Sequence, residues 1–232
     1  MKLTALALAA AVSSAASATF VEYVTVKTST TNNGVALDVY VLYARFNGAT
    51  DTVLNAFNFN AVGGATTNGF YHKDTTSYNS GVLQKTFGSW APQATGNAAT
   101  NRPFDSYLTI GGLPSGTNTS SADPSWNAAS SAGWTRPDVP SGYNIGWFNS
   151  SPPNFQGRVG GAGNTATDVR LGQFVVDAGA NIGTFNLKLG YNDGVAGSAV
   201  QFAETTFSLG AVPAPGAIAL LGLAGLAGRR RR

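Results

Sequence analysis

The feature that most constrains this chain is a series of short segments in which apolar and polar residues alternate, separated by residues that favour tight turns. The first two segments, residues 20–28 (FVEYVTVKT) and 34–46 (GVALDVYVLYARF), flank Asn32-Asn33-Gly34. Asn-Gly favours the positive φ angles of a two-residue hairpin turn. In the second segment the odd-numbered positions from Val35 to Tyr43 are apolar and Asp38 has the other parity, which predicts a strand with its odd-numbered face in the core.

Four further segments have the same character. Residues 52–62 (TVLNAFNFNAV) predict a third strand with Phe57 and Phe59 on one side, and we expect the first three strands to form a meander. Residues 168–179, 184–194 and 198–210 predict later strands, of which 184–194 alternates cleanly. The last one changes phase between Phe202 and Phe207, which predicts a β-bulge near Glu204-Thr205. We therefore predict an all-β fold, a single antiparallel β-sandwich of about 7–9 strands.

Residues 89–167 are dense in Pro, Gly, Ser and Asn, and they predict a long loop-rich middle inside one domain that spans residues 19–211. All four tryptophans of the chain lie in this middle region. One hypothesis is that Trp126, Trp134, Tyr143 and Trp147 form a stacking platform for sugar rings, which would make the body a carbohydrate-binding module. The alternative is that these side chains fix the long loop onto the sandwich.

The N-terminus has the pattern of a secretory signal peptide. Lys2 provides a positive charge, residues 3–12 (LTALALAAAV) are apolar, and Ala16-Ser17-Ala18 matches the small-residue pattern of a cleavage site. We expect residues 1–18 to be removed, so that the mature chain begins at Thr19.

The C-terminal residues 212–232 (VPAPGAIALLGLAGLAGRRRR) combine three parts. Pro213 and Pro215 stiffen a hinge at 212–216, and residues 217–228 are uncharged and apolar. The 13 residues 216–228 would reach only about 20 Å as a helix, against roughly 30 Å for a bilayer core. We expect a short transmembrane helix, better suited to transient insertion than to permanent anchoring. Positive charge favours the cytoplasmic side for the cluster that follows, Arg229, Arg230, Arg231 and Arg232.

This tail resembles a PEP-CTERM sorting signal, whose short region is also described as an ice-binding protein C-terminal domain. The resemblance rests on the order Val-Pro-x-Pro-Gly, apolar run and arginines, with Pro213, Ala214, Pro215 and Gly216 as the motif. Ala214 stands where the family usually has Glu. The resemblance implies a Gram-negative bacterial protein that is exported by the Sec machinery. An exosortase, which is a membrane cysteine protease-transpeptidase, would then process it near Pro213–Gly216, often alongside exopolysaccharide production.

The body is similar to a recurring type of exported PEP-CTERM protein in three stretches: FDSYLTIGG (104–112), WFNSSPPNFQG (147–157) and RLGQF (170–174). That similarity implies no particular activity.

The charge of the chain is concentrated in its sorting signals. The full sequence has 14 basic and 11 acidic residues, but without Lys2 and the four terminal arginines nine basic residues remain against the same 11 acidic ones. The composition therefore gives no reason to expect nucleic acid as a partner.

Residues suited to catalysis or metal binding are sparse. The chain has no cysteine, and His72 is its one histidine, which we interpret as a structural residue because no serine lies in a nucleophile motif. The scattered carboxylates suggest no catalytic pair, and we expect no metal site, with no cofactor required. Calcium is a weaker alternative, with turn formation as the competing explanation, for Asn192-Asp193-Gly194 and for Asp105, Asp123, Asp138 and Asp168.

Taken together, the sequence predicts a non-enzymatic protein exported to the cell surface or extracellular matrix. The expected partners are the Sec machinery, an exosortase and the membrane, with extracellular polysaccharide as a further partner if the carbohydrate-binding alternative holds. A secreted hydrolase is the third and weakest hypothesis.

Overall fold

The computed structural model describes residues 18–73, 83–85, 88, 90–92, 104–112, 118–127, 138–140 and 145–210. Within these ranges the chain is all-β, with short 3₁₀ turns such as η2 (Pro124–Asn127) and η3 (Pro152–Asn154) in its connections. No helix in this part of the chain is long and apolar enough to cross a bilayer. Residues 1–17 and 211–232, which carry most of the predicted signal peptide and the whole sorting tail, lie outside the described residues.

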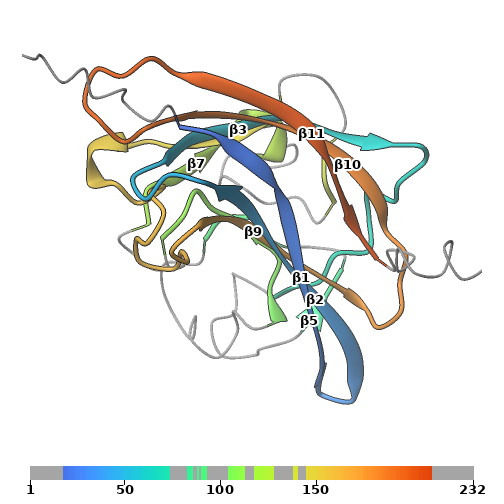
Figure 1. The fold of residues 1–232 in the computed structure, drawn as a ribbon. Coiled ribbons are helices and arrows are strands. Elements are labelled where there is room, and N and C mark those ends of the chain that lie inside the picture. The colour runs from blue at the N-terminus through green and yellow to red at the C-terminus, as the bar shows by residue number, and fades with distance from the viewer. Residues whose placement is uncertain are drawn as a thin grey trace, which may run out of the picture.

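The strands fall into three groups, and all their pairings are antiparallel. One sheet has the order β1-β2-β9-β6, the second has the order β11-β10-β3-β8-β7, and β4 pairs only with β5 (Figure 1). The predicted all-β class and antiparallel sheets are confirmed, and the two large sheets are consistent with a sandwich. The strands are β1 (Phe20–Asn32), β2 (Val35–Phe46), β3 (Thr52–Val62), β4 (His72–Lys73), β5 (Leu83–Gln84), β6 (Tyr107–Leu108), β7 (Ser120–Ala122), β8 (Trp147–Asn149), β9 (Asp168–Asp177), β10 (Gly183–Asn192) and β11 (Gln201–Leu209).

The predicted hairpin at the start of the chain is confirmed. Asn32 pairs with Val35, so the turn consists of Asn33 and Gly34, whose φ angles are 49° and 82°. Both angles lie in the left-handed region that a two-residue hairpin turn requires. The tip of this hairpin extends beyond the rest of the sandwich (Figure 1).

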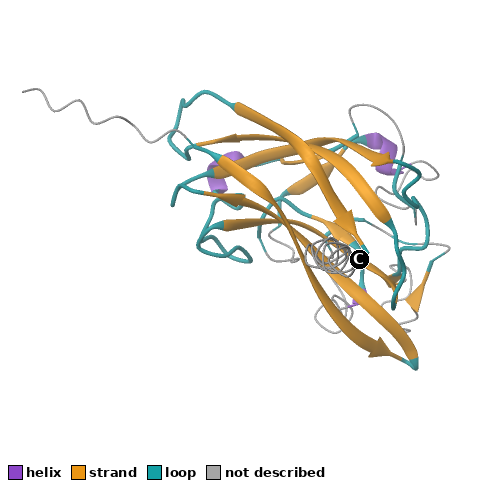
Figure 2. Ribbon diagram, turned by 45° about the vertical axis from the view of Figure 1, so that its right-hand side comes forward, coloured by secondary structure: helices purple, strands orange, loops and turns teal. Residues whose placement is uncertain are grey.

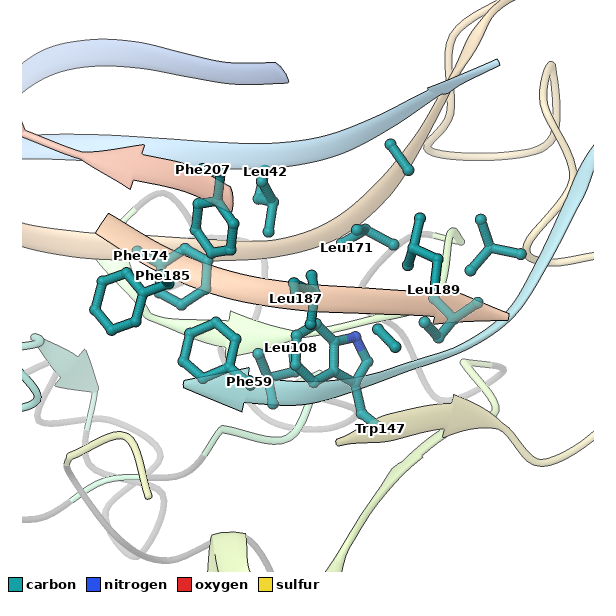
Figure 3. Packing of buried hydrophobic residues seen from close by; sticks show 14 of the residues in the cluster. Leu42, Phe59, Leu108, Trp147, Leu171, Phe174, Phe185, Leu187, Leu189 and Phe207 are labelled. Carbon is teal, nitrogen blue, oxygen red and sulfur yellow. The ribbon is translucent and has the colours of Figure 1, made fainter. Parts of the chain in front are cut away.

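The core lies between the two large sheets and is rich in aromatic rings. Phe59 of β3 stacks on Phe185 of β10, with ring centroids 5.1 Å apart, and faces Phe174 of β9 in the opposite sheet at 6.3 Å. Phe207 of β11 contacts the same group. Figure 3 shows these rings together with Leu42, Leu187 and Trp147, all pointing into the space between the strands. Phe59 is thus a central contact of the core.

The core-facing side of β2 differs from the prediction. The even-numbered residues Tyr40, Leu42, Ala44 and Phe46 enter the main core. On the other face, Leu37 and Val39 pack with Val175 under Tyr71, Leu83 and Phe104 in a second, smaller cluster. Because much of β2 is covered on both faces, alternation alone did not identify the side that faces the partner sheet.

The predicted meander is also wrong. After β2, a turn at residues 47–51 takes the chain across the sandwich, so that β3 lies between β10 and β8 in the five-stranded sheet. The place beside β2 is taken by β9. In Figure 2 the long strands run through the body, and the short 3₁₀ turns lie in the loops that connect them.

Candidate functional site

The outer face of the five-stranded sheet carries aromatic side chains that are exposed to solvent. Strand register places them in rows across the sheet: Phe202 of β11 lies opposite Gly190 of β10, Gly190 opposite Asn55 of β3, and Asn55 opposite Phe148 of β8. In the adjacent row, Lys188 pairs with Phe57 of β3. Strands from three separate parts of the sequence, β3, β8 and the consecutive pair β10 and β11, therefore supply one continuous surface.

The rings on this surface are exposed and have a defined arrangement. Phe202 is 57% exposed and Phe148 is 43% exposed. The Phe57 and Phe202 rings meet edge to face, with centroids 6.1 Å apart and planes at 89°. The Lys188 ammonium lies 5.6 Å from both ring centroids, within cation–π range. Exposed aromatic clusters of this kind are typical of interaction surfaces rather than of inert ones.

Beside the rings the surface is hollowed, with a volume of about 570 Å³. We call this hollow the aromatic groove and define it by Asn55, Phe57, Asp123, Pro124, Phe148 and Phe202. Its volume lies within the range of about 300–1,000 Å³ that is usual for small-ligand sites. Trp147 also borders it, although its indole is almost fully buried.

Two glycines shape the floor of the groove. A Cβ on Gly146 would overlap Ala56 O and Phe57, and a Cβ on Gly190 would overlap Asn55 Oδ1. The missing side chain at Gly190 leaves room between Phe202 and Asn55, which face each other across β10. The small residues therefore keep the surface low between the aromatic rings.

Polar groups accompany the rings. Lys188 Nζ lies 3.7 Å from Glu204 Oε2, and Asn186 Nδ2 donates to Glu204 Oε1 at 2.8 Å. The hydrogen bond from Asn186, together with the charge of Lys188, holds the pKa of Glu204 below its usual value. Asn55 Oδ1 is buried and has no hydrogen-bond donor within the described part of the chain. The groove thus combines apolar faces with amide and charged groups.

A bulge in β3 determines which phenylalanine faces outward. Asn186 pairs with Asn60 and Lys188 pairs with Phe57, so Asn58 and Phe59 together lie opposite one residue of β10. Asn58 has a φ of 54°, in the left-handed region that Asn tolerates better than most residues. The bulge places Phe59 in the core and Phe57 on the outer face. The prediction that Phe57 and Phe59 share a side is therefore wrong.

The bulge predicted in the last strand does not exist. β11 pairs with β10 in unbroken register from Gln201 to Leu209. Phe207 and Leu209 face the core, and Phe202 has the opposite parity and points outward. The change of phase in the sequence therefore arises because Phe202 is an exposed aromatic residue. This change is the one feature of the sequence from which the exposed ring could have been predicted.

The structure separates the aromatic residues predicted to form a sugar platform. Trp126 and Trp147 are buried in the core, with exposed fractions of 0% and 1%, and their rings lie 6.1 Å apart. Trp147 Nε1 donates to Thr109 O at 2.9 Å. Neither indole can present its face to a sugar, so the platform hypothesis fails for these two residues. Trp134 and Tyr143 lie outside the described residues.

The three stretches singled out in the sequence meet at one side of the sandwich. Trp147 bonds to Thr109, and Gln156 Nε2 donates to Ile110 O at 2.8 Å, which joins the segments 147–157 and 104–112. Thr109 N donates to Leu171 O at 3.0 Å, which ties in the segment 170–174. These bonds fix the loop that carries Phe155, whose backbone has a φ of 55°. The Phe155 ring is exposed and lies under the Arg158 guanidinium.

His72 is buried, as is its neighbour Asp105, and both side chains have 0% exposure. His72 Nδ1 lies 3.1 Å from Ser106 O and 3.6 Å from Asp105 Oδ1, and the imidazole packs edge to face on Trp90. A histidine enclosed in this way cannot reach a substrate in solution, so its interpretation as a structural residue agrees with its position.

The calcium candidates are not brought together. Asp168 bonds to Arg45, Asp123 accepts from Ser125 N, and Asp193 accepts from Val195 N. Within the described ranges, no three His, Asp or Glu side chains gather at a distance suited to a metal ion.

The predicted sorting residues fall mostly outside the described part of the chain. This applies to Ala16, to the motif Pro213–Gly216 and to the cluster Arg229–Arg232. Ala18 and Thr19, at the predicted cleavage site, are described: Ala18 is 2% exposed and packs on the core. Comparison with known proteins gives no further assignment, because no family model, no curated protein and no solved structure matches this chain.

Proposed function

We propose that this chain is an exported, non-enzymatic protein of the cell surface or extracellular matrix, delivered by a PEP-CTERM-like sorting signal. The observation that carries the proposal is the sequence of residues 212–232, in which a Pro-x-Pro hinge is followed by an apolar run and then by four arginines. The signal-peptide pattern at residues 1–18 supports export.

The tail would act through its length and charge. The apolar run is shorter than a bilayer core requires, so it would insert weakly and leave the hinge at the membrane surface. The arginines would hold the orientation, because moving them through the bilayer is unfavourable. An exosortase would then cut near Pro213–Gly216 and release or transfer the body.

The chemistry of the body supports a role without catalysis. The sequence contains no cysteine nucleophile, and the one histidine, His72, is enclosed in the interior. The sandwich would therefore serve as a carrier of binding surfaces.

The test compares the full chain with a variant in which Arg229–Arg232 are changed to Ala, and with a Lys variant as the charge-matched control. We expect surface delivery and cleavage for the wild type and the Lys variant, and retention of an unprocessed chain for the Ala variant. Cell fractionation and mass spectrometry of the mature C-terminus measure both. Unchanged delivery of the Ala variant would overturn the sorting proposal. A mature wild-type chain that still ends at Arg232 would show that the tail is not cleaved and instead anchors the protein.

We further propose, as a second function, that the aromatic groove binds a carbohydrate chain. The supporting observation is the combination of the exposed rings of Phe148 and Phe202 and the half-buried ring of Phe57 with polar groups at its floor and rim. Sugar rings have an apolar face and hydroxyl edges, so they fit a surface that offers aromatic contacts next to amide and carboxylate acceptors. Asn55 Oδ1, which has no donor in the described chain, is one acceptor that a hydroxyl group could supply.

The charge of the groove favours a neutral glycan. Lys188 is balanced by Glu204, and Asp123 adds a carboxylate at the rim. The described lining has no excess positive charge that would attract an acidic sugar. A flat hydrophobic protein partner would gain less from the polar groups, which would have to be desolvated without hydroxyl partners.

The binding test uses the full chain and a panel of cellohexaose, laminarihexaose, mannohexaose and an alginate hexamer. Trp147 borders the groove, so intrinsic fluorescence should report occupancy, and calorimetry gives the affinity. Changing Phe202 to Ala should weaken binding of a neutral hexamer about tenfold. Changing Phe155, an exposed ring outside the groove, to Ala should leave it unchanged. Equal losses in both variants, or no binding by any neutral hexamer, would refute this assignment. Loss of self-association on changing Phe202 to Ala, without glycan binding, would identify the groove as a protein interface instead.

A further inference from the structure

A buried carboxylate lies directly beside the predicted start of the mature chain. Asp51 ends the turn between β2 and β3 and is 2% exposed. Its Oδ2 accepts from Gly48 N at 3.0 Å and from Thr19 N at 3.4 Å. Thr19 is held from the other side as well, because Asn47 N donates to Thr19 O at 3.2 Å. The turn therefore fixes the backbone at Thr19.

The hydrogen-bond partners of this carboxylate carry no charge. No Lys, Arg or His side chain forms an ion pair with Asp51 among the described residues, and its Oδ2 accepts from two neutral backbone amides, those of Gly48 and Thr19. Burying an ionised carboxylate without a cation is costly. The carboxylate also occupies the space that a Cβ on Gly48 would need, so the turn is built around it.

We propose that cleavage of the Ala18–Thr19 bond creates the missing cation, and that the new α-ammonium group of Thr19 forms an ion pair with Asp51. This inference rests on the proposed export and its cleavage site. In the reaction, water hydrolyses the amide, the carboxylate of Ala18 leaves with the signal peptide, and the Thr19 nitrogen becomes a protonated amine. The nitrogen that already contacts Asp51 Oδ2 thereby gains a full positive charge.

The ion pair has a structural role in the mature protein. Ala18 packs on the core in the uncleaved chain, and that contact is lost on cleavage. The new charge interaction offsets this loss and keeps the first residue docked, with β1 beginning at the next residue, Phe20. Export processing and stability of the folded body are thus coupled through one carboxylate. The competing explanation is that Asp51 only caps the turn through Gly48.

A double-mutant cycle separates these explanations. Two chains that both run to Arg232 are compared, one beginning at Thr19 and one retaining residues 14–18, each with Asp51 or with Asp51→Asn. The substitution keeps the size and a hydrogen-bond acceptor but removes the charge. Urea unfolding followed by tryptophan fluorescence gives the unfolding constant of each chain.

We expect Asp51→Asn to raise the unfolding constant about tenfold more in the chain that begins at Thr19 than in the longer chain. Equal effects in the two chains would overturn the ion pair and leave only turn capping. Mass spectrometry of the exported protein tests the premise separately. A mature N-terminus other than Thr19 would show that the natural protein does not form the pair, whatever the engineered chains do.

Discussion

The left-handed backbone at Asn58 allows a quantitative prediction about the stability of Asn58 variants. The bulge at this residue decides which ring enters the core and which enters the aromatic groove. We compare Asn58→Val with Asn58→Gly. Both substitutions remove the Asn side chain and its hydrogen bonds, so their difference reports mainly on the backbone at φ 54°. Val should suffer a penalty of about 1–2 kcal/mol in this region, whereas Gly should suffer none.

The expected order of stability of the Val and Gly variants is the reverse of that in an ordinary strand. In an ordinary strand, Val is more stable than Gly by up to about 1 kcal/mol. At Asn58 we expect Val to be the less stable by about 1–2 kcal/mol, which for a domain of this size lowers the melting temperature by about 2–8 °C. Thermal and urea unfolding of both variants measure the difference.

The same pair of substitutions at Thr206 provides the control. Thr206 lies on the same outer face, in the regular register of β11, and there Val should be the more stable variant. If Asn58→Val proved as stable as Asn58→Gly, the bulge would not require a left-handed residue, and the account of Phe57 and Phe59 would fail.

Three further predictions concern the core, acid stability and the loop. Phe59→Ala should lower the free energy of unfolding by about 3–5 kcal/mol, because Phe59 touches rings from both sheets; a urea-midpoint change equivalent to less than about 1 kcal/mol would contradict its central place. Burial opposes ionisation of Asp38, but hydrogen bonds from Lys27, Ser29 and Gly179 lower its pKa overall. Its carboxylate therefore stabilises the fold above the ordinary pKa of about 3.9 and loses that contribution as the pH falls through the lowered folded-state pKa. The difference in urea stability between wild type and Asp38→Asn should therefore shrink in acid. A difference that does not change with pH would disprove the stabilising role of the Asp38 carboxylate. Gln156→Ala should lower the free energy of unfolding by about 1–3 kcal/mol, because Ile110 O and Thr119 N would lose their side-chain partner. Hydrogen exchange should then show faster opening of residues 150–164, and unchanged protection would argue that Gln156 does not hold this loop in place.

Local features of the fold could be predicted from the sequence, because they depend on neighbouring residues. The Asn33-Gly34 turn needs only two residues with positive φ, and the alternation in β10 places Phe185, Leu187 and Leu189 in the core as expected. The errors arose where alternation has two explanations. β2 is covered on both faces, and Phe202 has the wrong parity for the core because it is exposed.

The aromatic groove could not be located from the sequence for a different reason. Its rings come from β3, β8 and β11, and only the pairing of β10 with β3 and β11, and of β3 with β8, brings them into line. The tryptophans are large and grouped in a loop-rich region, a pattern that also fits side chains packed in the interior. Trp90, Trp126 and Trp147 bury their large apolar surface in the interior, and it is Phe148 and Phe202 that are exposed at the groove.

The direction of β11 has a consequence for how the protein would stand on a surface. Phe202 lies near the start of this strand, and Gly210, the last described residue before the predicted tail, follows its other end. Eight residues of extended chain span about 26 Å, so β11 acts as a spacer between the tail and the rings. If the proposed tail attaches the protein to a membrane, the length of β11 would separate Phe202 from the point of attachment by a distance close to the thickness of a bilayer core.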